Sequence, residues 1–192
     1  MANLCIVGAC GRMGRMVAEK AKACGFKLTG AVEVPGAPGV GENFYGVIVT
    51  DDLEQGLKGA NVVIEFALPE GIEKRAELYA KHNVAAVIGT TAVGALGLAA
   101  LDAAAQKIPI IHAPNFSLGV NLLGLFLEKA AGVLDASYDV EIVEMHHHFK
   151  KVFNNTGRTV NLLTIQKYLT FIHIQNIIAN TISFITIKST VI

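Results

Sequence analysis

The chain has 192 residues, of which 52% are hydrophobic and 17% charged, and its formal net charge is zero. This composition excludes a disordered chain, and a balanced charge without a basic stripe predicts no nucleic-acid partner and no membrane partner. The apolar run from Leu4 to Val7 is too short for a signal-peptide core or a membrane span. Because Cys5, Cys10 and Cys24 have no metal-type spacing, we expect reduced thiols in a cytoplasmic protein.

Short apolar runs alternate with segments of helical periodicity from Leu4 to His112. Apolar runs that end at turn residues predict buried strands, and apolar positions three and four apart predict helices. We predict strands at 4–7, 26–34, 47–49, 61–66, 84–88 and 108–112, and helices at 11–24, 69–82 and 92–106. Segment 36–45 is predicted to be a loop, Asp51 to cap a short helix, and Pro69 to lie in a first helical turn.

This alternation predicts an α/β fold of the Rossmann type, in which a parallel sheet is covered by helices on both faces. Ligands of such sheets bind at the C-terminal ends of the strands. We place the dinucleotide-binding domain at residues 1–120. Residues 121–192 are predicted to form an incomplete α+β substrate and oligomerisation domain, with strands at 139–145 and 181–187. From about residue 153 its tail is rich in Ile and contains no Asp or Glu.

The segment Gly8-Ala9-Cys10-Gly11-Arg12-Met13-Gly14 joins the first predicted strand to the first predicted helix. The missing side chains of its glycines let backbone approach a pyrophosphate, the helix N-terminus attracts the negative charge, and Arg12 adds a cation. Glu33 ends the second predicted strand, where a carboxylate accepts hydrogen bonds from an adenosine ribose. Val34 and Pro35 follow it, with no Arg for a 2′-phosphate, which favours NADH over NADPH. The alternative is a tight turn whose glycines serve only packing.

A second cluster, Glu144-Met145-His146-His147-His148-Phe149-Lys150-Lys151, leaves the end of predicted strand 139–145. Its imidazole and ammonium groups suit a dianionic substrate and offer a proton donor near neutral pH. A metal site is one alternative. Neighbouring strand residues point to opposite faces, however, and no ligand spacing nearby completes a tetrahedron, so we predict no metal. A solvated basic loop is another alternative, and His112 is expected to be structural.

Taken together, these segments resemble the dihydrodipicolinate reductases, also called 4-hydroxy-tetrahydrodipicolinate reductases. The matching segments are Gly8 to Gly14, Phe66 with Pro69-Glu70-Gly71, Gly89-Thr90-Thr91, Ala113-Pro114-Asn115-Phe116-Ser117-Leu118-Gly119-Val120-Asn121 and Glu144-Met145-His146-His147. The resemblance implies an NAD(P)H-dependent enzyme that reduces 4-hydroxy-tetrahydrodipicolinate, a small cyclic dicarboxylate, to tetrahydrodipicolinate in lysine biosynthesis through diaminopimelate. It also implies a homotetramer.

The resemblance further implies a role for each matching residue. His146 corresponds to the family's catalytic histidine, Lys150 to its proton-donating lysine, and His147 to a substrate-binding histidine. Hydride would come from the nicotinamide and the proton from a cationic side chain. The implied cofactor-binding residues are Gly8, Ala9, Cys10, Gly11, Arg12, Met13, Glu33, Phe66, Gly89, Thr90, Thr91, Ala113, Pro114, Asn115 and Phe116.

The chain departs from the family pattern at several positions. Ala67 and Leu68 replace polar or basic residues, and His148 replaces an Arg. In the family, an Asp-Ala-Pro-Ser-Gly-Thr-type segment grips a substrate carboxylate, whereas residues 152–158 here read Val-Phe-Asn-Asn-Thr-Gly-Arg. A frame change or truncation near Lys151, or divergence, would produce this segment and the tail. The alternative functions are a truncated nucleotide-binding remnant without catalysis and a Rossmann oxidoreductase with another substrate.

Overall fold

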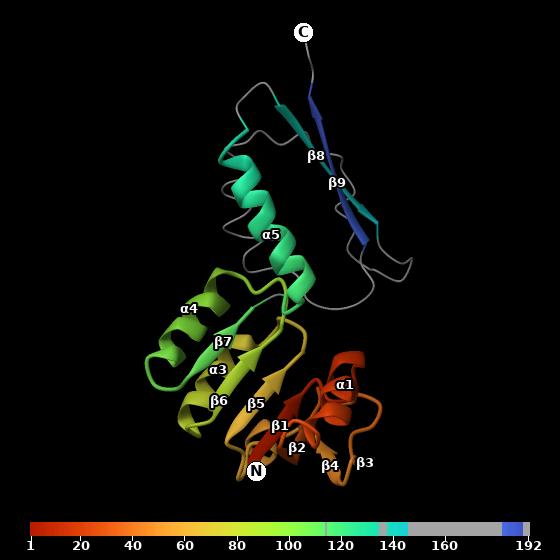
Figure 1. The fold of residues 1–192 in the computed structure, drawn as a ribbon. Helices are drawn as coiled ribbons and strands as arrows, with labels where there is room; N and C mark the ends of the chain where they lie inside the picture. The colour runs from red at the N-terminus through yellow and green to blue at the C-terminus, as the bar shows by residue number, and fades with distance from the viewer. Residues whose placement is uncertain (114, 135–137, 146–181, 190–192) are drawn as a thin grey trace. The chain divides into compact units, whose positions relative to one another are not determined.

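The structure, a computed structural model, describes residues 1–113, 115–134, 138–145 and 182–189. The chain divides into two compact units, Met1–Pro114 and Asn115–Ile192. The sequence had predicted a boundary after residue 120. The N-terminal unit is a sheet flanked by helices, and the described part of the C-terminal unit is a helix followed by two strands (Figure 1).

The N-terminal unit is built on a seven-stranded sheet in the order β3-β4-β2-β1-β5-β6-β7. The strands are β1 Ala2–Val7, β2 Phe26–Val32, β3 Asn43–Phe44, β4 Val47–Thr50, β5 Val62–Glu65, β6 Ala85–Ile88 and β7 Ile110–His112. Neighbouring strands run parallel except for β3, which is antiparallel to β4. The chain leaves β1 towards one edge and later returns to its other side at β5, which creates the crevice where such sheets bind ligands. This topology confirms the predicted Rossmann-type fold.

Helices cover both faces of this sheet. Successive side chains of β1 point to opposite faces, so they pack in two separate apolar clusters. Leu4 and Ile6 pack in one cluster with residues of α1, and Cys5 and Val7 pack in the other with residues of α3 and α4. The helices of this unit are α1 Arg12–Ala21, α2 Leu53–Gly56, α3 Ile72–Lys81 and α4 Ala95–Ala105. The first strand therefore carries the central apolar core, as its sequence predicted.

Three local predictions were wrong. The segment predicted as a loop contains β3, which adds a short strand at the sheet edge. The cap of α2 is Asp52, not Asp51, because the Asp52 carboxylate accepts the hydrogen bond from the backbone N–H three residues on, at 3.2 Å. Helix α3 begins after Gly71 and not at Pro69, because Gly71 takes a left-handed φ of 75° that interrupts the helical path.

The C-terminal unit contains α5, Leu118–Ala131, and β8, Tyr138–Met145. Ser117 caps α5 by accepting a hydrogen bond from a backbone N–H of the first turn at 3.4 Å. Strand β8 pairs antiparallel along its whole length with β9, Ile182–Ser189, so the strands predicted in both places are confirmed. No helix in the described ranges is long and apolar enough to cross a bilayer.

Candidate functional site

The turn after β1 holds the glycine loop, residues 8–14, over the ends of three strands. Parallel pairing of β1 with β5 places Gly8 beside Phe66. Gly8 has a φ of 79°, and a Cβ at this position would come within 2.3 Å of the Phe66 carbonyl oxygen. The N–H groups of Gly8 and Ala9 both donate to the Val32 carbonyl at the end of β2, at 2.9 and 3.2 Å. The close approach therefore requires glycine at position 8.

Helix α1 begins without a side chain over its first N–H groups. Its N-cap, Gly11, makes no side-chain cap bond, and the first turn contains no acidic residue. Asp52 and Ser117 cap α2 and α5, whereas α3 and α4 begin after Gly71 and Gly94 and, like α1, have no side-chain cap bond. The open N–H groups and the helix dipole both favour an anion at the start of α1. In its first turn Arg12 is exposed and Met13 is half-buried, so the Arg12 guanidinium is accessible to such an anion.

Glu33 follows β2, and its carboxylate is tied to the glycine loop. The Cys10 N–H donates to Glu33 Oε1 at 2.8 Å, and the Val34 N–H donates to Oε2 at 3.3 Å. Each carboxylate oxygen still has a lone pair for a further donor. Burial first, and then the Glu33 charge, raise the pKa of the Cys10 thiol. The predicted ribose ligand and the glycine loop are thus brought together.

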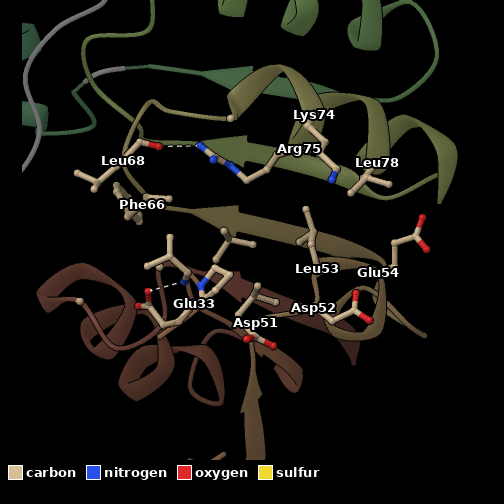
Figure 2. A pocket seen from close by; sticks show the side chains of 18 residues that line it. Glu33, Asp51, Asp52, Leu53, Glu54, Phe66, Leu68, Lys74, Arg75 and Leu78 are labelled. Carbon is tan, nitrogen blue, oxygen red and sulfur yellow. Dashed lines mark hydrogen bonds between the residues drawn. The ribbon is translucent and has the colours of Figure 1, made fainter. Parts of the chain in front are cut away.

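A cavity of about 970 Å³ lies beside the glycine loop, with Glu33 and Asp51 on one side and Phe66, Leu68 and Arg75 on the other (Figure 2). Among the predicted cofactor residues, those that line it are Gly8, Gly11, Glu33 and Phe66. Lining residues to which the sequence had assigned no ligand contact include Asp51, Asp52, Leu53, Glu54, Leu68, Lys74, Arg75 and Leu78. Only their position in the sequence could have indicated a role, because they follow β4 or β5 or lie on α3, around the crevice of the sheet.

Glu65, the last residue of β5, is a fully buried carboxylate that the sequence analysis missed. Its Oε1 accepts hydrogen bonds from Arg75 Nη2 at 2.9 Å and Thr90 Oγ1 at 2.7 Å. Its Oε2 accepts from Arg75 Nε at 3.1 Å and the Tyr79 hydroxyl at 2.5 Å. Burial first, and then the Glu65 charge, raise the pKa of Tyr79 well above its ordinary value, so this hydroxyl remains a donor. Four donors satisfy a charge that would otherwise be costly to bury.

The family resemblance places two segments at the nicotinamide end of the cofactor, Gly89 to Thr91 and Ala113 to Phe116, and the first of them begins directly after β6. Within it Thr90 is 1% exposed and faces Glu65, whereas Thr91 is exposed. The second segment begins after β7, where the Ala113 N–H donates to the Ile88 carbonyl at 3.1 Å. The sheet therefore fixes the start of each segment at its C-terminal edge.

The remaining predicted site residues belong to the C-terminal unit or lie outside the described residues. Asn115 is buried; its Oδ1 accepts the Ser117 N–H at 2.8 Å, and its Nδ2 has no partner among the described residues. Phe116 is partly exposed. The residues outside the described ranges are Pro114, His146, His147, His148 and Lys150. Within the described ranges, no three His, Cys, Asp or Glu side chains are placed to hold a metal ion.

The glycine loop, Glu33 and the cavity lie inside a region that matches a known family. The sequence model described as "Dihydrodipicolinate reductase, N-terminus" matches residues 2–116. The chain belongs to the dihydrodipicolinate reductase family. This match covers the N-terminal unit and each family segment from the glycine loop to Phe116, so the resemblance seen in the sequence is confirmed.

Individual relatives extend the match beyond this region. The 4-hydroxy-tetrahydrodipicolinate reductase of Cupriavidus taiwanensis is 44% identical over 156 residues, which are 77% of this chain and 59% of the relative. That of Anaeromyxobacter sp. strain Fw109-5 is 46% identical over 158 residues, 79% of this chain and 59% of the relative. The chain thus spans 59% of the length of these two relatives.

A solved structure of the family has a similar fold. The dipicolinate-bound dihydrodipicolinate reductase from Paenisporosarcina sp. TG-14 is 25% identical, with a TM-score of 0.63 over 90% of this chain and 65% of that chain. The likeness agrees with the Rossmann-type fold and with family membership.

Proposed function

We propose that the N-terminal unit binds NADH or NADPH, with the pyrophosphate over Gly8 and Gly11 and the adenosine in the cavity. The observation that carries this proposal is the uncapped start of α1 beside a cavity of about 970 Å³. A volume of this order suits a small-molecule site, and a mostly apolar wall suits an adenine ring. Glu33 is held where a carboxylate can accept the ribose hydroxyls. The other proposed cofactor contacts are Ala9, Cys10, Arg12, Met13, Phe66, Gly89, Thr91, Ala113, Pro114, Asn115 and Phe116. Thr90 is proposed to contribute its main chain, because its hydroxyl is buried against Glu65.

The proposed reaction is reduction of 4-hydroxy-tetrahydrodipicolinate to tetrahydrodipicolinate in a cytoplasmic enzyme. Family membership supports this reaction, and three free cysteines support a reducing compartment. A reduced nicotinamide, when bound, would supply the hydride, and the 4-hydroxyl group of the substrate leaves as water. Lys150 and His146 are proposed to supply and relay the proton that balances it, and His147 to bind a substrate carboxylate.

We propose a preference for NADH within this site. Four carboxylates line the cavity against two cations, Lys74 and Arg75, and the guanidinium of Arg75 is already paired with Glu65. A 2′-phosphate beside Glu33 would meet like charge. We expect a Kd for NADH roughly tenfold below that for NADPH. Val34→Arg adds a cation next to Glu33 and is expected to bring the two Kd values closer together. Equal or tighter binding of NADPH by the unchanged protein would contradict the preference.

The test of the proposed function combines binding with turnover. Titration of the full chain with NADH, followed by pyridine-2,6-dicarboxylate as a product analogue, measures the two sites in turn. Substrate-dependent oxidation of NADH that His146→Ala abolishes is the expected result. Failure of the unchanged protein to bind either nucleotide would overturn the proposal.

A second candidate function is nucleotide binding without catalysis. One observation favours it: residues 152–158 lack the family's carboxylate-binding segment. This candidate predicts that NADH binds with unchanged affinity whether or not pyridine-2,6-dicarboxylate is present, and that no substrate is reduced. Nucleotide-dependent binding of the dicarboxylate would exclude it.

A further inference from the structure

The buried carboxylate of Glu65 is linked to two segments that border the proposed cofactor site. We propose that Glu65 is a positioning residue: through Arg75 and Thr90 it fixes residues 66–71 and 89–91 in the arrangement that NADH or NADPH requires. The inference rests on the proposed function. It assigns Glu65 no contact with the cofactor, because the side chain is fully buried.

The first link runs through Arg75 to the turn between β5 and α3. While Arg75 Nε and Nη2 hold Glu65, Nη1 donates to the Glu70 carbonyl at 2.6 Å and Nη2 also donates to the Leu68 carbonyl at 2.8 Å (Figure 2). The planar guanidinium thus joins the carboxylate to two backbone carbonyls of one turn. Leu68 and Phe66 from this turn line the cavity, so the position of Arg75 sets one wall.

The second link runs through Thr90, whose hydroxyl donates to the same oxygen of Glu65 that accepts from Arg75 Nη2. Thr90 is 1% exposed, so its side chain faces the interior. The preceding Gly89 lies against the ring of Phe66, where a Cβ would be 2.0 Å from Cε1. The two segments are therefore in contact, and one carboxylate holds both.

Stability alone does not account for this network. Replacing a buried ionic group by apolar side chains of similar volume is often neutral or stabilising, and β5 is otherwise Val, Val and Ile. A carboxylate at the end of β5 is useful where hydrogen bonds must fix the orientation of neighbouring segments, because apolar packing is less directional. Three of the hydrogen bonds made by Glu65 and Arg75 end on segments 66–71 and 89–91. These are the two segments of the proposed cofactor site whose orientation must be fixed.

Tyr79 provides a matched control inside the same network. Its hydroxyl donates to Glu65 from α3 and is as deeply buried as Thr90, and neither side chain lines the cavity. Thr90, however, belongs to segment 89–91, which the family resemblance places at the cofactor, whereas Tyr79 belongs to neither proposed cofactor segment. Removing either hydroxyl takes one donor from the same carboxylate. A purely structural network predicts similar effects of Tyr79→Phe and Thr90→Val, whereas positioning predicts that only Thr90→Val disturbs cofactor binding.

The experiment measures the NADH Kd and the melting temperature of the full chain carrying Thr90→Val, Thr90→Ser or Tyr79→Phe. Thr90→Val is expected to weaken NADH binding about tenfold, the effect of one lost bond to a charged group. Thr90→Ser retains the hydroxyl and is expected to stay within about twofold of the unchanged chain. Tyr79→Phe is expected to lower the melting temperature and leave the Kd within about twofold.

Hydrogen exchange on the free protein tests positioning without any cofactor. Thr90→Val is expected to speed exchange in segments 66–71 and 89–91, and Tyr79→Phe is not. Equal losses of NADH affinity in Thr90→Val and Tyr79→Phe, or unchanged affinity in Thr90→Val, would overturn the positioning role. An unchanged protein that binds no nucleotide would instead overturn the proposed function, and the exchange data would still decide whether Glu65 orders the two segments.

Discussion

At the scale of single residues, the glycines of the first loop have different amounts of room. A Cβ at Gly8 or Gly14 would come within 2.3 Å of backbone oxygen, whereas at Gly11 the nearest atom would be 3.2 Å away. Packing of the free protein therefore explains glycine at positions 8 and 14. It does not by itself require glycine at position 11, which lies at the uncapped start of α1 and lines the cavity. Close approach of a pyrophosphate is the remaining physical reason.

Gly11→Ala is accordingly predicted to separate cofactor binding from folding. The added methyl needs a shift of a few tenths of an ångström in its neighbours, so the melting temperature should fall by no more than a few degrees. It would also stand in the path of the phosphate, and we expect the NADH Kd to rise about tenfold or more. Gly14→Ala is the comparison, with a large loss of melting temperature. Calorimetry and NADH titration of both variants measure this, and tight NADH binding by Gly11→Ala would contradict it.

At the scale of elements, the sequence was informative where periodicity was strong and weak where a side-chain contact decides. Buried strands and amphipathic helices follow from apolar spacing alone. The start of α3 depended on the backbone conformation of Gly71, and the cap of α2 on which of two adjacent aspartates reaches the backbone. Glu65 was missed because its partners come from α3 and from the segment after β6. No local sequence pattern predicts a hydrogen bond between residues so far apart along the chain.

The corrected cap of α2 leads to a prediction about neighbouring carboxylates. Asp52→Ala removes the hydrogen bond to the first turn and is expected to lower the free energy of unfolding by about 1 kcal/mol. Asp51 does not make this capping bond, so Asp51→Ala should change the free energy of unfolding by less than about 0.5 kcal/mol. Urea denaturation of the two variants gives both values. A larger loss of stability in Asp51→Ala than in Asp52→Ala would show that Asp51, the residue first predicted, caps α2.

At the scale of the whole molecule, stability is predicted to fall in alkaline solution because a thiol is buried on the central strand. Burial raises the pKa of Cys5 from 9.0 to about 12. A raised thiol pKa means that the folded state keeps its proton more tightly, so the stabilisation is complete below pH 9 and is lost as the pH rises towards 12. Tyr79, whose pKa burial also raises, adds a loss of the same sign above its ordinary value of 10.0.

Over this pH range Cys5 is expected to lower the free energy of unfolding by about 1.4 kcal/mol per pH unit. Urea denaturation from about pH 8 to about pH 11 should show the unchanged protein losing stability more steeply than Cys5→Ala by this amount. Cys24→Ala removes an exposed thiol and should run parallel to the unchanged protein. Parallel curves for Cys5→Ala and the unchanged protein would show that Cys5 is not the linked group.

The distribution of the core also predicts that the N-terminal unit is sufficient for nucleotide binding. Among residues 1–113 and 115–134 the buried apolar side chains all lie between Leu4 and Ile108, and the described residues that line the cavity all belong to the unit Met1–Pro114. A fragment of residues 1–114 therefore retains both apolar clusters and the proposed adenosine and pyrophosphate contacts.

We expect this fragment to unfold cooperatively and to bind NADH within about tenfold of the full chain, because only contacts at the nicotinamide end are lost. Gly11→Ala in the fragment should weaken binding as it does in the full chain, which ties the signal to the glycine loop. Circular dichroism melting and NADH titration provide the two measurements. A fragment that folds but binds no NADH would place the decisive cofactor contacts in the C-terminal unit. One that fails to fold would show that the sheet needs residues beyond 114 for its stability.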